Sequence, residues 1–268
     1  MDNTPYNYEK RIRERRYRRE KMRRRKRRRR ILLVILLLLA VLLTGVLVKC
    51  GGEKELPENQ QVVEKPSKPQ SDPQPQPQPR PTDWRLTLVN PWNPLPETWE
   101  PPEMKELSSG WEVDARCYDD LMEMLDGCQA AGHEALVCSA YRPRSLQETL
   151  FGNLVQEYMD QGMTEAEAKE EAAKEVAVPG TSEHQLGLAM DIVDMDYQIL
   201  DDTQADTPAQ KWLLENSWRY GFILRFPKEK EDITGIIYEP WHYRYVGREA
   251  AEEIYRSNLC LEEYLQGK

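Results

Sequence analysis

A long apolar run near the N-terminus sets the first constraint on what this chain can form. From Ile31 to Val48 no residue is ionisable, and Leu, Ile and Val dominate. As a helix at ~1.5 Å per residue, the run would be roughly 27 Å long, which is just enough to cross a bilayer core. We therefore expect a transmembrane signal-anchor helix over residues 31–49. A cleaved signal peptide is the alternative, but its apolar region would be unusually long and no small-x-small cleavage site follows.

The charge before this run predicts its orientation. Residues 1–30 hold 16 Lys and Arg against 4 Asp and Glu, a net charge of +12. The positive-inside rule then places this basic segment in the cytoplasm and everything after Cys50 outside the membrane. We expect a single-pass membrane protein with an extracytoplasmic domain.

The remaining residues divide into a polar tract and a folded part. Residues 50–83 are rich in Pro, Gln, Glu and Lys, a composition that favours an extended, disordered stalk. Residues 84–268 are long enough for one domain with its own core. Outside the basic segment, 21 basic residues stand against 42 acidic ones, which argues against nucleic acid as a partner. The oligomeric state stays open.

Periodicity and capping signals predict an α+β domain with a small central antiparallel sheet and flanking helices. Two capping boxes, Ser145–Glu148 and Thr164–Glu167, indicate helix starts, and Pro208 is expected at a first helical position. The expected strands are 86–90, 135–141, 187–193, 222–225 and 243–246. The expected helices begin near Asp114 and cover 145–160, 165–175, a stretch from Pro208 to Gly221, and 248–265.

The cysteines give no metal or redox signature, because none has CxxC spacing. Cys117 and Cys128 are expected on one helix, about 16 Å apart at ~1.5 Å per residue, which is too far for a disulfide. Pairing among Cys128, Cys138 and Cys260 stays open.

Two short segments carry the residue types of a catalytic zinc site. His184 and Asp191 lie seven positions apart, and Glu239 precedes His242 by three. Catalytic zinc usually has three protein ligands and one water, so His184, Asp191 and His242 would suffice. Pro240 excludes a regular helix here, which leaves Glu239 free to face the metal-bound water as a general base.

The surroundings of Asp191 fit this interpretation. If 187–193 is a strand, Gly187 and Ala189 share a face with Asp191 and leave room for an ion and a substrate. The third histidine, His133, has no acidic or histidine partner at ligand spacing, and we expect it on the surface.

Three motifs together resemble the VanY-like D-alanyl-D-alanine carboxypeptidases, zinc peptidases that share a fold with the Hedgehog signalling domain. These motifs are Ser139-Ala-Tyr141-Arg142, the stretch from Pro179 to Asp191, and Glu239-Pro-Trp241-His242. The resemblance covers about Leu86 to Tyr264. One departure is Ala140, where the family commonly has glycine.

The resemblance implies one Zn²⁺ per chain on His184, Asp191 and His242, with Glu239 as the base. It also implies that Arg142 contacts the peptide near the reacting carbonyl and stabilises developing negative charge. Gln147 and Ser182 are expected at the terminal D-alanine, and Ser139, Tyr141 and Trp241 are further expected substrate contacts.

The implied reaction is release of the C-terminal D-alanine from bacterial peptidoglycan stem peptides or their precursors. An L,D-carboxypeptidase, a D,D-dipeptidase and a stem-peptide endopeptidase share these motifs. The anchor counts against the dipeptidase, whose free substrate suits a cytoplasmic enzyme. A non-catalytic wall-binding module would tend to lose a ligand or the base, and here all four residues are present.

Overall fold

The computed structural model describes residues 83–267. The predicted cytoplasmic segment 1–30, the predicted anchor 31–49 and all but the final residue of the predicted stalk lie outside this range. Within residues 83–267 no helix is both long enough and apolar enough to span a bilayer.

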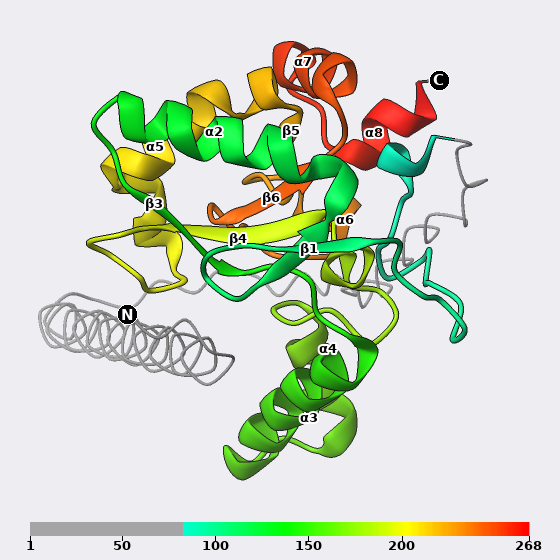
Figure 1. Ribbon diagram of the computed structural model, residues 1–268. Coiled ribbons are helices and arrows are strands. Elements are labelled where there is room, and N and C mark those ends of the chain that lie inside the picture. The colour runs from blue at the N-terminus through cyan, green and yellow to red at the C-terminus, as the bar shows by residue number, and fades with distance from the viewer. Residues whose placement is uncertain (1–82, 268) are drawn as a thin grey trace, which may run out of the picture. The chain divides into compact units, whose positions relative to one another are not determined.

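The described residues form an α+β structure of six strands, seven α-helices and five short 3₁₀ turns (Figure 1). The strands are β1 (Met104–Glu106), β2 (Glu112–Asp114), β3 (Ala135–Ser139), β4 (Ala189–Asp194), β5 (Phe222–Leu224) and β6 (His242–Tyr245). The helices are α2 (Tyr118–Ala130), α3 (Arg144–Asp160), α4 (Glu165–Ala173), α5 (Pro208–Asn216), α6 (Glu231–Thr234), α7 (Arg248–Ser257) and α8 (Leu261–Gln266). The 3₁₀ turns are η1 (Trp84–Leu86), η2 (Ala115–Cys117), η3 (Glu183–Leu186), η4 (Asp202–Asp206) and η5 (Ser217–Tyr220).

Four strands make the central sheet in the order β3-β4-β6-β5, and every neighbouring pair is antiparallel. The predicted small antiparallel sheet with flanking helices is therefore confirmed. In the register, Ser139 lies opposite Asp191, and Asp191 lies opposite His242. Directly opposite residues share a face of the sheet, so these three side chains form a row across three strands.

The other face of the sheet is held against helices. Tyr243, next to His242 in β6, donates its hydroxyl proton to Gln210 of α5 over 2.9 Å. Since side chains alternate along a strand, Tyr243 and the buried Met190 and Ile192 of β4 lie on the side opposite Asp191 and His242. Helix α5 contacts β4, α2 contacts β3 and α7 contacts β5. The sheet thus has an apolar face under helices and a second face that carries the candidate ligands.

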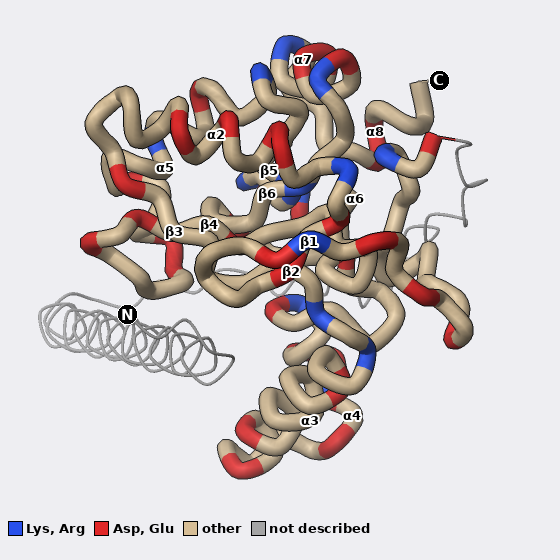
Figure 2. Tube along the Cα trace, in the orientation of Figure 1, with Lys and Arg blue, Asp and Glu red and all other residues tan. Residues whose placement is uncertain are grey.

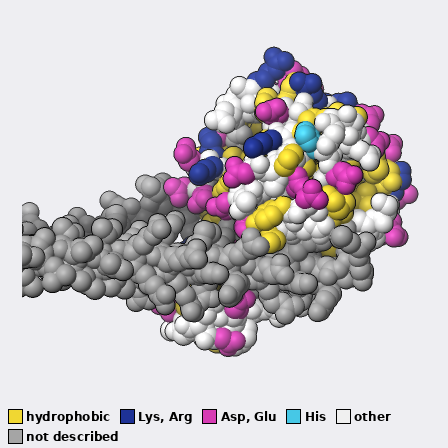
Figure 3. Space-filling model, turned by 90° about the vertical axis from the view of Figure 1, so that its left-hand side faces the viewer, with side chains coloured by type: hydrophobic (Ala, Val, Ile, Leu, Met, Phe, Trp, Pro, Cys, Tyr) yellow, Lys and Arg dark blue, Asp and Glu magenta, His cyan; other side chains and the backbone are white. Residues whose placement is uncertain are grey.

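Helices α3 and α4 pack against each other as a hairpin in the lower part of Figure 1. Acidic residues predominate along both (Figure 2), in agreement with the negative balance of this part of the sequence. Elsewhere charged and hydrophobic side chains are interspersed on the face shown in Figure 3.

Several predicted helix ends are confirmed. Thr164 and Glu167 form both bonds of a capping box at α4, and Thr207 caps α5 with Pro208 at its first position. Gly221 ends the α5–η5 segment in the left-handed conformation. The box predicted at Ser145–Glu148 is wrong, because α3 already begins at Arg144 with Pro143 as N-cap.

Other predicted elements are wrong. The strand predicted at 86–90 is the turn η1 followed by irregular chain, with Asn90 in an isolated bridge to Asn93. The single helix predicted over 248–265 is two helices, because Asn258 takes the left-handed conformation (φ 53°) after α7. The hairpin of β1 and β2 falls where a loop and a helix start were expected.

Gly187 is not part of the strand that contains Asp191, contrary to the prediction. It ends η3 with φ 74°, and β4 begins two residues later. A Cβ atom at this position would lie 2.7 Å from Cε of Met104 and 3.0 Å from the backbone nitrogen of Asp114. Gly187 therefore serves a tight turn and close packing against the β1–β2 hairpin, instead of leaving room beside Asp191.

The cysteines among the described residues are all buried, and none of them is in a disulfide: Cys117, Cys128, Cys138 and Cys260. The disulfide pairings left open for Cys128, Cys138 and Cys260 are thus not formed in this structure.

Candidate active site

Three side chains from different elements converge on one point. Asp191 comes from β4, His242 from the neighbouring β6, and His184 from η3, just before β4. Oδ1 of Asp191 lies 3.4 Å from Nε2 of His184 and 3.2 Å from Nδ1 of His242. One ligand atom from each residue lies within 4.8 Å of the others, and all three residues are buried. The predicted metal-ligand set is therefore assembled in space.

The arrangement fits a zinc ion. Two ligands of a tetrahedral zinc at 2.0–2.1 Å are separated by roughly 3.3 Å. The two distances to Asp191 Oδ1 have this value within about 0.1 Å. Two neutral imidazoles and one carboxylate are a common donor set for catalytic zinc, which leaves one position for water or substrate.

The orientation of His184 is fixed by backbone contacts. Its Nδ1 lies 2.7 Å from the carbonyl oxygen of Ala140, and its own carbonyl accepts a bond from the backbone nitrogen of Arg142 over 3.1 Å. A carbonyl can only accept, so Nδ1 carries the proton and the lone pair is on Nε2. Within residues 83–267 this Nε2 has no hydrogen-bond partner. Its lone pair is available to a metal.

Burial and neighbouring charges shift the pKa values of the two histidines in opposite directions. Burial, with the charge of Arg142, lowers the pKa of His184 to about 4. Burial would also lower the pKa of His242, but the carboxylates of Asp191 and Glu183 outweigh it and raise that pKa to about 9. Without a metal, His242 is therefore protonated at neutral pH, and metal binding must displace this proton.

Glu239 lies beside the candidate ligands without being one of them. Its Oε2 is 3.7 Å from Nδ1 of His242, and the residue is 6% exposed. The backbone nitrogen of His242 donates to the carbonyl of Glu239 over 3.1 Å, which closes a turn around Pro240, where no regular helix was expected. The carboxylate is thus held next to the nitrogen that faces the metal position.

Arg142 follows β3 and reaches the same site. Its guanidinium lies 3.6 Å from Oδ2 of Asp191 and donates to Oε1 of Gln147 over 3.1 Å. Gln147 is fully buried, and its amide nitrogen donates to the carbonyl of Ala177 over 2.7 Å. The structure therefore shows Gln147 holding Arg142, while its predicted contact with a terminal D-alanine stays a prediction.

The other predicted substrate contacts are spread around these residues. Ser139 lies opposite Asp191, and its Oγ is buried without a hydrogen-bond partner among the described residues. Ser182 is buried at the start of η3, and Tyr141 is half-buried beside Arg142. Trp241 is 1% exposed and packs in the main core, so its side chain supports the strand that contains His242.

A group of buried charges that was not predicted from the sequence lies behind the ligands. Glu183, Arg225 and Arg244 are each at most 2% exposed, and both arginines contact Oε1 of Glu183 at 2.7 Å. Burial would raise the pKa of Glu183, but these arginines outweigh it and hold the pKa far below its usual range. The available signal was an arginine between apolar residues in the stretch Ile223-Leu224-Arg225-Phe226.

The sequence is similar to known D-alanyl-D-alanine carboxypeptidases. Residues 110–248 match the family model VanY, described as D-alanyl-D-alanine carboxypeptidase. A D-alanyl-D-alanine carboxypeptidase of Enterococcus faecalis is 47% identical over 183 residues, 68% of this chain and 66% of that protein. The chain thus spans just under two thirds of that relative's length.

Two solved structures resemble the described residues. One is a variant of the vancomycin resistance D,D-pentapeptidase VanY from a VanB-type cassette in complex with Zn(II). It is 46% identical, with a TM-score of 0.62 over 68% of this chain and 99% of that one. The other is the LD-carboxypeptidase LdcB, 36% identical, with a TM-score of 0.60 over 68% of this chain and 86% of that one.

Proposed function

The chain belongs to the VanY family of D-alanyl-D-alanine carboxypeptidases, and we propose that it is a zinc carboxypeptidase that removes the C-terminal D-alanine from peptidoglycan stem peptides or their precursors. The observation that carries this proposal is the convergence of His184, Asp191 and His242, with Glu239 beside them. Zinc is the metal of the related VanY structure, and the distances to Asp191 suit it.

The chain's residues divide the work of amide hydrolysis. A zinc ion on the three ligands would supply a Lewis acid that lowers the pKa of water to roughly 7. Glu239 accepts a proton from the attacking water and returns it to the departing amine of D-alanine. Arg142, held by Gln147, provides positive charge where the reacting carbonyl oxygen becomes negative.

The test is to identify the products that the full-length chain releases from defined stem peptides. Pentapeptide, tetrapeptide and tripeptide stems are incubated with the protein and analysed by mass spectrometry, with and without a chelator. We expect the pentapeptide to lose one D-alanine, the other stems to persist, and the chelator to abolish the reaction. Product formation that is unaffected by removal of the metal contradicts the zinc mechanism.

An L,D-carboxypeptidase is the second candidate, because LdcB also resembles this chain over most of its length. Such an enzyme would shorten the tetrapeptide to the tripeptide and leave the D,D bond intact. The same set of peptides therefore distinguishes the two activities.

We also propose that residues 31–48 anchor the enzyme in the cell membrane, with the catalytic part outside. The basic segment and apolar run support this topology, and the wall substrate is found on that side. Expressed in a bacterium, the protein should sediment with membranes, and protease added to spheroplasts should remove residues 84–268. Full protection of that part from the protease would exclude the proposed orientation.

A further inference from the structure

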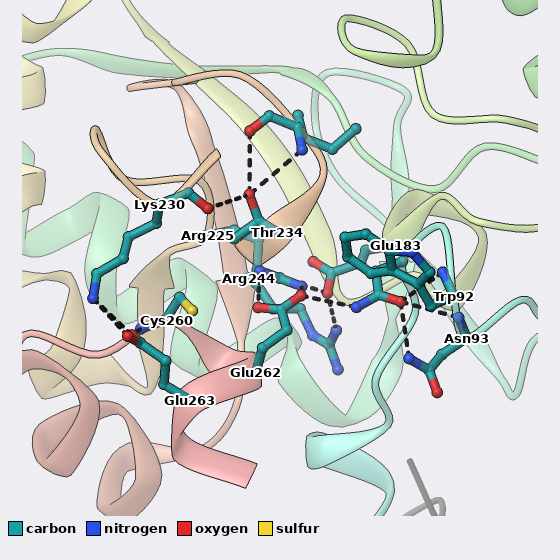
Figure 4. A network of polar contacts seen from close by, with 12 residues as sticks. Trp92, Asn93, Glu183, Arg225, Lys230, Thr234, Arg244, Cys260, Glu262 and Glu263 are labelled. Atoms are coloured by element: carbon teal, nitrogen blue, oxygen red, sulfur yellow. Dashed lines mark hydrogen bonds and ion pairs between the residues drawn. The ribbon is translucent and has the colours of Figure 1, made fainter. Parts of the chain in front are cut away.

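Four buried charged side chains lie behind the candidate metal ligands and take no part in the proposed reaction. They are Glu183 in η3, Arg225 after β5, Arg244 in β6 and Glu262 in α8, and none is more than 4% exposed. Figure 4 shows the four carboxylate and guanidinium groups converging from these separate elements. Burial of a charge is costly unless it is paired, so the pairing of each group is informative.

The four groups neutralise one another. Arg225 binds both oxygens of Glu262, at 2.9 Å and 2.6 Å, and donates from Nε to Oε1 of Glu183 at 2.7 Å. Arg244 donates from Nη1 to the same Oε1 at 2.7 Å, and its Nη2 and Nε donate to the backbone carbonyls of Arg85, Thr87 and Tyr245. Two carboxylates thus face two guanidiniums, and every one of these contacts to Glu183 uses Oε1.

The second oxygen of Glu183 faces the site. Oε2 of Glu183 lies 3.8 Å from Nε2 of His242, and among the described residues neither atom has a hydrogen-bond partner. The other nitrogen of the same ring, Nδ1, is the one directed at Asp191. When Nδ1 of a neutral imidazole binds a metal, its proton must be on Nε2, which then needs an acceptor. A purely structural ion cluster accounts for Oε1 and leaves Oε2 unexplained.

We propose that Glu183 is a positioning residue for His242, and that its carboxylate accepts a hydrogen bond from the Nε2–H group when Nδ1 binds zinc. This inference rests on the zinc site of the proposed function. Arg225 and Arg244 hold Glu183 from behind, so that Oε2 is directed at the ring. The two histidines are thereby oriented by different acceptors, a carboxylate for His242 and the Ala140 carbonyl for His184.

The first test compares zinc affinity in two variants of the full-length chain. Glu183→Gln keeps the size of the side chain but provides only one acceptor atom for both the arginines and His242. Glu262→Gln is the matched control, because it also removes a buried carboxylate from Arg225 but leaves Oε2 of Glu183 in place. Zinc dissociation constants are measured by competition with a chelator, and stability by urea unfolding without metal.

We expect both variants to lose stability, and only Glu183→Gln to bind zinc about 10–100-fold more weakly. Glu262→Gln should remain within about threefold of the unmodified chain. Equal zinc affinity in the two variants overturns the proposal. If the unmodified chain itself binds no zinc, the proposed function fails instead, so the two failures are distinguishable.

A second measurement needs no substitution and therefore does not depend on the variants folding. The zinc-loaded protein, with ¹⁵N-labelled histidine, contains only three histidines to assign. We expect zinc on Nδ1 of His242 and a proton on its Nε2 that exchanges slowly with water. An Nε2 proton that exchanges as fast as that of the partly exposed His133, or zinc on Nε2, overturns the proposal.

Discussion

The carboxylate of Glu239 is placed to move protons, and replacing it should separate catalysis from metal binding. Glu239→Gln removes the proton acceptor but changes no candidate ligand. We expect kcat to fall by about 10²–10⁴-fold while zinc content stays at one ion per chain. The measurements are D-alanine release and metal analysis of the same preparation.

The control for this substitution is Glu229→Gln, which changes an exposed carboxylate ten residues earlier and should leave kcat unaltered. A Glu239→Gln protein that retains both zinc and full activity would exclude Glu239 as the base.

The buried thiols should be unreactive in the folded protein. Burial raises the pKa of Cys128 to about 11 and that of Cys260 to about 12, so little thiolate exists at pH 8. In a Cys50→Ala variant, which retains only cysteines of the described range, we expect negligible labelling by a disulfide reagent until urea is added. Four thiols should then react at once. Rapid labelling of the native protein would show that one of these sites opens to solvent.

The sequence was sufficient to predict the candidate ligands but not the residues that hold them. His184, Asp191 and His242 lie in two short motifs that together resemble a known zinc peptidase family, so the combined motifs identified them. Glu183 and Arg244 resemble ordinary surface charges in the sequence. Their burial depends on a partner about sixty positions away, because each charge is tolerated inside only with the other present.

Among the elements, local signals decided which could be predicted. Helices α4 and α5 have caps within three residues of their starts, so their starts were predicted correctly. Strands β1 and β2 have three residues each, too few for an alternating pattern, and they form because they pair with each other. The break between α7 and α8 depends on a single left-handed residue, Asn258, which periodicity does not reveal.

The turn between η3 and β4 should not tolerate a side chain at Gly187. Gly187→Ala adds a Cβ that meets Met104 and the backbone of Asp114, in addition to strain at φ 74°. Gly132→Ala is the matched control, because φ is 86° there and nothing lies within 4 Å of the added atom. We expect about 1 kcal/mol of destabilisation for the control and at least about 1 kcal/mol more for Gly187→Ala, from urea unfolding. If the two variants lose equal amounts of unfolding free energy, the β1–β2 hairpin moves away from the added Cβ atom at no cost.

For the molecule as a whole, the zinc-free protein should have a stability maximum near pH 6.5. The pKa of His184 is lowered to about 4, so the unfolded chain binds more protons between pH 4 and about 6.5, and stability rises with pH there. The pKa of His242 is raised to about 9, so the folded chain binds more protons between about 6.5 and 9, and stability falls with pH there. Urea unfolding with a chelator at pH 5, 6.5 and 9 measures both the rise in stability below pH 6.5 and the fall above it.

Two comparisons identify the groups responsible for this pH dependence of stability. His242→Gln should abolish the fall in stability between pH 6.5 and 9 and leave the rise between pH 4 and 6.5 unchanged. Saturating zinc should stabilise the protein at pH 9, by about 4 kcal/mol at a thousandfold excess over its dissociation constant. A zinc-free stability that is flat from pH 6.5 to 9 would contradict the raised pKa of His242.

The buried charge cluster also has a consequence for the order in which the protein folds. Asn90 and Glu262 are bonded across 172 positions of the chain, and Glu262 in turn binds Arg225, which contacts Glu183. Contacts between such distant segments close late, because the entropy of loop closure opposes them. We therefore expect His242 to acquire its final surroundings near the end of folding, after the transition state has formed. Zinc should accordingly slow unfolding of the native chain while leaving its refolding rate almost unchanged.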